Sequence, residues 1–66
     1  MSGTNESLGR AQELAERMRA KLDALERLAD AGDVDAAVED LAEIAELAKQ
    51  IEAEVQRARA SADAGA

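Results

Sequence analysis

Apolar residues recur at alternating steps of three and four through the second half of the chain. This stepping averages about 3.5 residues, so the side chains line one stripe of an α-helix that packs against another helix, as in a coiled coil. The members of the stripe are Val34, Ala37, Leu41, Ile44, Ala48, Ile51, Val55 and Ala58. We expect a helix over about residues 33–60 and a frayed tail over 61–66, where the stepping stops.

The first half carries a similar pattern. The residues that recur at steps of three and four are Leu8, Ala11, Leu14, Met18, Leu22, Leu25 and Ala29, with Leu28 broadening the stripe. Four residues near the start are acceptable N-caps, namely Ser2, Thr4, Asn5 and Ser7. The pattern therefore predicts a first helix over about residues 6–31.

Gly32 is placed where a left-handed residue ends one helix, and Asp33 can cap the next. A connection this short makes the two helices antiparallel neighbours, with both apolar stripes on the same side. The chain contains no proline and is built mainly from helix-forming residues. The expected fold is one all-α domain, an antiparallel two-helix hairpin of the coiled-coil type that assembles into a four-helix bundle.

Sixty-six residues are close to the lower limit for a core that outweighs the entropy lost on folding. The chain has no cysteine and no histidine, so it has neither a disulfide nor the usual ligands of structural zinc. We therefore expect stability to come from association with another helical surface. The predicted interface consists of Leu14, Met18, Leu22, Leu25, Val34, Ala37, Leu41, Ile44, Ala48, Ile51 and Val55.

The net charge is −7, and residues 33–46 carry six acidic residues without a basic one. This charge argues against direct binding of nucleic acid, which requires clustered Lys and Arg. The acidic ladder is predicted to be a solvated face, with contact to a basic partner as the alternative; its members are Asp35, Glu39, Glu43 and Glu46. A short basic cluster, Arg17, Arg19 and Lys21, is likewise predicted to face solvent, with an acidic partner or polyanion as the alternative.

Nucleophilic or acid–base catalysis needs a tuned group held in a cleft, usually beside a second group that orients it. Without His or Cys, a two-helix hairpin offers no such pair. We therefore expect no catalytic residue, cofactor, metal or small-molecule ligand. The sequence has no apolar run long enough for a membrane span and no secretory signal pattern, so the expected location is the cytoplasm.

From Leu22 to about Ala58 the chain resembles the small subunit of bacterial exodeoxyribonuclease VII. Leu22 and Leu25 precede Gly32 at the family's spacing, and two later segments match if two residues are missing after the turn. These segments are Ala37-Val38 and Glu46-Leu47-Ala48-Lys49. The chain departs from the family pattern at Ala29-Asp30, Leu41, Ile44 and Ile51.

This resemblance implies a non-catalytic helical subunit that binds the large subunit of a nuclease acting on single-stranded DNA. The chemistry and any metal would then belong to that large subunit. The architecture is also similar to that of Rop-type plasmid copy-number regulators, which are helical hairpins that dimerise into a four-helix bundle. Two partners therefore stay open: a large nuclease subunit, or a second copy in a homodimer or higher oligomer that serves as a regulator or adaptor.

Overall fold

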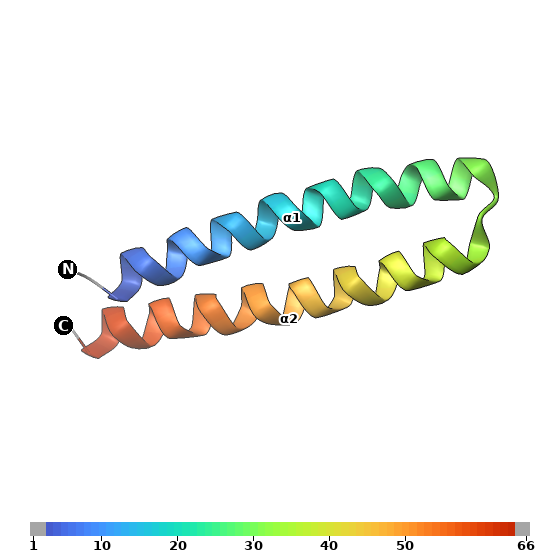
Figure 1. The fold of residues 1–66 in the computed structure, drawn as a ribbon. Helices are drawn as coiled ribbons and strands as arrows, with labels where there is room; N and C mark the ends of the chain where they lie inside the picture. The colour runs from blue at the N-terminus through green and yellow to red at the C-terminus, as the bar shows by residue number, and fades with distance from the viewer. Residues whose placement is uncertain (1–2, 65–66) are drawn as a thin grey trace.

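The computed structural model describes residues 3–64, which form two long helices side by side in opposite directions (Figure 1). Helix α1 spans Gly3–Ala31 and helix α2 spans Val34–Ala64. The molecule measures 51 × 14 × 11 Å, and both ends of the described chain lie at the same end of the hairpin. The predicted all-α antiparallel hairpin is confirmed.

The chain reverses at Gly32 and Asp33. Gly32 has a positive φ of 75°. Its N–H donates to the Ala29 carbonyl (3.1 Å), and the Asp33 N–H donates to the Leu28 carbonyl (3.0 Å), which is the Schellman arrangement for a helix C-terminus. The Asp33 Oδ1 accepts a hydrogen bond from the Ala36 N–H at 3.2 Å and so caps α2. Both predicted roles at the turn are confirmed.

Replacing Gly32 by alanine should destabilise the hairpin by about 1–2 kcal/mol, because an L-residue crowds its own backbone at positive φ. Urea unfolding followed by helical circular dichroism measures this loss. Gly9→Ala is the matched control, since Gly9 is helical with open space around it and should gain about 0.5–1 kcal/mol. A Gly32→Ala variant as stable as the parent would contradict the role assigned to the turn.

Both helices are longer at the open end of the hairpin than the sequence pattern predicted. α1 begins at Gly3 instead of residue 6, and α2 continues through Ala64 instead of ending near 60. The predicted fraying was wrong for residues 61–64, while 65–66 lie outside the described residues. The two ends hold each other: the Thr4 hydroxyl donates to the Ala58 carbonyl at 3.2 Å, and Gly3 lies against Ser61.

The helices contact each other along a heptad pattern of buried and half-buried residues, which we call the hairpin seam. Ala24 and Ala36 lie at its edge. In α1 the seam comprises Thr4, Ser7, Ala11, Leu14, Met18, Lys21, Leu25 and Leu28, and in α2 it comprises Ala37, Asp40, Ile44, Leu47, Ile51, Glu54, Ala58 and Ser61. Several of these side chains are small or charged, so a continuous large apolar core does not form between the two helices.

The predicted apolar stripe is therefore not one contact surface. Half of its positions in α2 lie in the hairpin seam, namely Ala37, Ile44, Ile51 and Ala58. The other half are exposed, namely Val34, Leu41, Ala48 and Val55. The expectation that a single face of the hairpin holds all these residues was wrong, because the seam passes through Asp40 and Glu54 where the stripe passes through Leu41 and Val55.

Candidate interaction surface

One long side of the hairpin is apolar at every position that adjoins the seam. Each of these positions comes directly after the second seam residue of its heptad. In an antiparallel pair of helices, such positions from both helices lie on the same side of the pair. We call them the outer apolar face: Leu8, Ala15, Leu22 and Ala29 in α1, and Val34, Leu41, Ala48, Val55 and Ala62 in α2. All nine are exposed, and none carries a charge.

The outer apolar face includes most of the large apolar side chains that the described hairpin leaves in solvent. Leu41 keeps 51% of its surface exposed and Val34 keeps 69%. Near the turn, Ala29 of α1 and Val34 and Leu41 of α2 line one groove of about 360 Å³. This shared groove shows that the faces of the two helices are continuous. Contiguous apolar surface of this kind is typical of sites where proteins contact other molecules.

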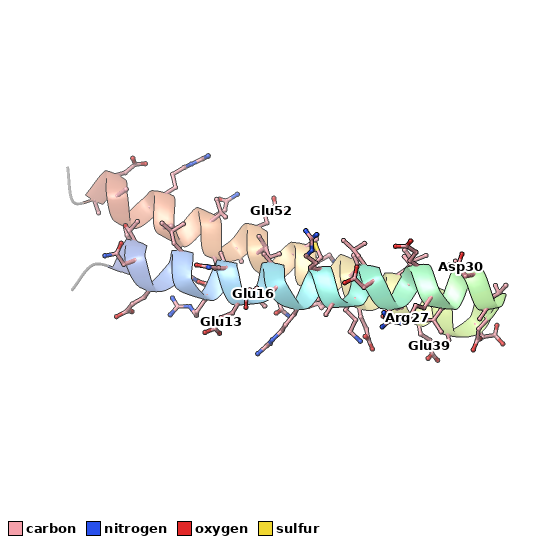
Figure 2. The ribbon with its side chains drawn as sticks, turned by 90° about the horizontal axis from the view of Figure 1, so that it is seen from above. Glu13, Glu16, Arg27, Asp30, Glu39 and Glu52 are labelled. Carbon is pink, nitrogen blue, oxygen red and sulfur yellow. The ribbon has the colours of Figure 1, made fainter. Side chains whose placement is uncertain are left out.

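The opposite side of the hairpin is polar and carries the cross-helix ion pairs. Arg10 of α1 donates from Nε to Oε1 of Glu54 at 3.0 Å, and Arg57 pairs with the other carboxylate oxygen of Glu54. Glu13 and Glu39 extend into solvent along one edge in Figure 2, whereas Glu52 extends from the other edge. The two long sides of the hairpin thus differ sharply in polarity.

Glu54 is a seam residue with only 8% of its surface exposed. Burial alone would raise the pKa of its carboxyl group, but hydrogen bonds from Arg10 and Arg57 outweigh burial and lower the pKa below its ordinary value of 4.5. Arg10 also donates to the hydroxyl of the buried Ser7 at 3.3 Å. The carboxylate is therefore held charged between the helices and ties the start of α1 to the end of α2.

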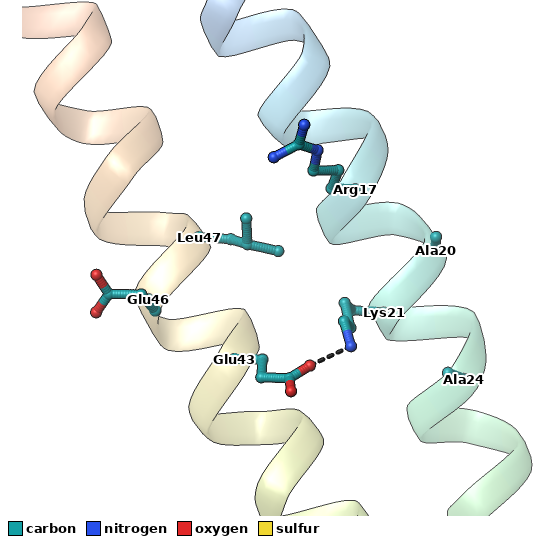
Figure 3. Close-up of a pocket in the computed structure, with 7 residues that line it drawn as sticks. All are labelled: Arg17, Ala20, Lys21, Ala24, Glu43, Glu46 and Leu47. Atoms are coloured by element: carbon teal, nitrogen blue, oxygen red, sulfur yellow. Dashed lines mark ion pairs between the residues drawn. The ribbon is translucent and has the colours of Figure 1, made fainter.

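Lys21 forms the second cross-helix cluster, nearer the turn. Its ammonium pairs with Glu43 (Figure 3). It also lies 3.7 Å from Oδ1 of Asp40, which is only 7% exposed. The hydrogen bond to Glu43 raises the pKa of Lys21 above its ordinary value of 10.5, against a smaller lowering by burial. Among the described residues, Asp40 Oδ2 is the buried side-chain oxygen without a hydrogen-bond partner. This cluster places charged groups in the seam and leaves one carboxylate oxygen without a hydrogen bond.

These shifts set a pH window for stability. Because the folded pKa of Glu54 is lowered, its contribution is complete above 4.5 and is lost as the pH falls through the folded pKa. The raised pKa of Lys21 gives a contribution that is complete below 10.5 and is lost as the pH rises through the folded pKa.

We expect thermal unfolding to show a loss of stability at acid pH in the parent and a smaller loss in Glu54→Gln. Glu39→Gln, at an exposed position, is the matched control, and equal acid limbs for all three proteins would contradict this account.

An open groove of about 550 Å³ lies on the polar side between the helices (Figure 3). Leu47 projects toward α1 at its centre, while Glu46 points away from the gap. The groove has a cation already paired with carboxylates, and the raised pKa keeps the Lys21 amine protonated, the opposite of what an amine nucleophile requires. Its residues support a fixed ion pair and offer no activated group.

Six of the eleven predicted interface residues lie in the hairpin seam, and five lie on the outer apolar face. Those in the seam are Leu14, Met18, Leu25, Ala37, Ile44 and Ile51. Those on the outer apolar face are Leu22, Val34, Leu41, Ala48 and Val55. The contact of the second group with another chain stays a prediction.

Sequence reasoning missed the charged seam residues Asp40 and Glu54, and it placed Lys21 in solvent although Lys21 is half-buried in the seam. A sequence signal is present for Lys21 and Glu54 but not for Asp40, whose symmetric position is Ala24. Glu43 stands as far after Gly32 as Lys21 stands before it, and the same symmetry relates Glu54 to Arg10. Opposite charges at equal distances from a hairpin turn meet across the helices.

The surface predictions for the other charged residues are confirmed. The acidic ladder is exposed throughout, at Asp35, Glu39, Glu43 and Glu46. Arg17 and Arg19 are exposed as well. Within residues 3–64, no three His, Cys, Asp or Glu side chains form a group suited to hold a metal ion. Neither described helix contains a segment that is both long and apolar enough to cross a bilayer.

In comparisons with known proteins, no protein-family model, curated protein or solved structure matches the chain. The resemblance to the small subunit of exodeoxyribonuclease VII therefore rests on the residues quoted for it. The outer apolar face is the feature of the described hairpin on which a functional proposal can be built.

Proposed function

We propose that the protein is a non-catalytic, cytoplasmic assembly module that holds the helices of another protein chain on its outer apolar face. The observation that carries this proposal is the face itself, nine exposed positions along both helices without a charge. Covering such a surface is favourable at roughly 25 cal/mol for each Å² of apolar area removed from water. Helices that expose apolar residues next to a coiled-coil seam commonly pack into bundles of more than two helices.

The small amount of apolar surface buried within the hairpin supports the same function. Among the described residues, the buried apolar side chains are only Ala11 and Ala58, and no large side chain is fully buried. A domain of this size gains little from one seam against the entropy of ordering two long helices. Association supplies the missing burial.

Molar mass across a concentration series, measured with helicity by circular dichroism, tests this function. Light scattering with refractive-index detection suits a chain without aromatic residues. We expect either a helical oligomer or a monomer with little helicity that awaits its partner. A stably folded, fully helical monomer at all concentrations would contradict the proposal, because such a hairpin needs no cover.

A second candidate makes this chain the accessory subunit of a nuclease that degrades single-stranded DNA. It is supported by the resemblance over residues 22–58, with Gly32 at the turn of the hairpin. In this case the large nuclease subunit covers the outer apolar face, and catalysis belongs to that subunit. Co-expression with a large subunit from the same source should yield a complex that survives purification, and failure to bind any such subunit would rule this candidate out.

A further inference from the structure

The hairpin exposes more surface than a chain of its size keeps as a compact monomer. Its accessible area is 4845 Å². A compact monomer of 6.9 kDa exposes about 4,000 Å², which leaves an excess of roughly 850 Å². One partner in a standard protein interface buries about 800 Å². One interface of standard size, with a second hairpin docked on this one, would therefore bury about as much area as the excess.

Over the three central layers of the outer apolar face, the order of large and small residues is the same read from either end. Ala15 and Ala48 stand near the middle of their helices, and a larger residue stands one heptad to each side. These larger residues are Leu8 and Leu22 in α1, and Leu41 and Val55 in α2. A twofold interface requires this property, because the same patch must be complementary to itself. Reversed end for end about these alanines, the central layers meet large residues with large ones and alanine with alanine, whereas Val34 falls opposite Ala62.

Charge decides between the two ways of stacking the hairpins. The turn end is acidic, since residues 33–46 hold six acidic residues and no basic one. A parallel pair would place two such ends side by side. An antiparallel pair separates them by most of the 51 Å length, far beyond a screening length of about 8–10 Å, and brings each toward the end that holds Arg57 and Arg59.

We infer that a second copy of this chain occupies the outer apolar face in antiparallel orientation. The twofold axis then passes between the two Ala48 residues, and α2 packs on α2 while α1 packs on α1. This arrangement forms a four-helix bundle in which small side chains let the helices approach closely at the centre. The inference rests on the proposed assembly function and names its partner.

A single cysteine tests the contact at the twofold axis. The chain has no cysteine, so Ala48→Cys introduces the sole thiol. Under mild oxidation we expect a disulfide-linked dimer to form about a hundredfold faster than from Ala42→Cys at micromolar protein, because thiols held together meet at millimolar effective concentration. Ala42 is the matched control, an exposed alanine of α2 outside both the seam and the outer apolar face.

Three other results would overturn the inference. Equal rates for both cysteine variants in a parent that is dimeric by light scattering would exclude the antiparallel contact and leave the proposed function standing. A mixed disulfide between Ala15→Cys and Ala48→Cys chains, without the Ala48→Cys homodimer, would show a parallel pair. A weakly helical monomer would exclude the second copy as occupant, whereas only the stable helical monomer contradicts the assembly function itself.

Discussion

Leu41→Asp is expected to leave the protein monomeric at concentrations where the parent is a dimer. Leu41 lies on the outer apolar face of α2 and keeps 51% of its surface exposed in the lone hairpin. In the proposed dimer it is covered, so the substitution would bury an unpaired carboxylate in each copy, which costs about 3–5 kcal/mol per site. Light scattering across a dilution series measures the loss of association.

The control for this variant is Ala42→Asp, which adds the same charge to the next residue of α2. Ala42 is exposed and outside both contact surfaces, so its variant should associate as the parent does. If Leu41→Asp remained as dimeric as Ala42→Asp, the outer apolar face would not be the contact surface.

Ile51→Asp should instead destroy the hairpin itself. Ile51 is one of the seven large apolar residues in the hairpin seam, and the new carboxylate would stand one turn before the buried Glu54. Removing this half-buried aliphatic side chain costs about 2 kcal/mol, the low end of the range for core residues, before the charge is counted, and the whole stability of a small domain is only about 5 kcal/mol. Circular dichroism should show the loss of most helicity at room temperature.

Ile51→Val is the control, because it keeps an apolar seam at a cost of about 0.5–1.5 kcal/mol and should stay helical. An Ile51→Asp variant with the helicity of the parent would mean that the helices do not depend on the seam. Together, the variants at Leu41 and Ile51 separate the two contact surfaces that the sequence pattern merged into one stripe.

The fold could be predicted from local features. Gly32 between two helical patterns, followed by Asp33 as a cap, determines a hairpin because both residues act within one turn of themselves. The outer helix ends could not be predicted this way. The contacts that keep Gly3 and Ser61 in helices join residues from opposite ends of the chain, so no local window contains them.

The periodicity also could not predict that the apolar residues divide between two surfaces. Steps of three and four fit the series through Ala37, Leu41 and Ile44 as well as the series through Ala37, Asp40 and Ile44. The pattern follows the more hydrophobic series, whereas the folded chain places Asp40 inside because Lys21 stands across from it. Only the register of the hairpin brings that cation close, and register is a property of both helices together.

The reversal of the chain depends on the backbone of Gly32, whose positive φ lies between the end of α1 and the start of α2. A substitution that favours the right-handed helical conformation at this position would let α1 run directly into α2 as a single rod. In such a rod Leu28 and Ala37 would stand nine residues apart on one helix and so on opposite faces, which would separate the two halves of the seam. One dihedral angle therefore keeps the two halves of the seam face to face within a single chain.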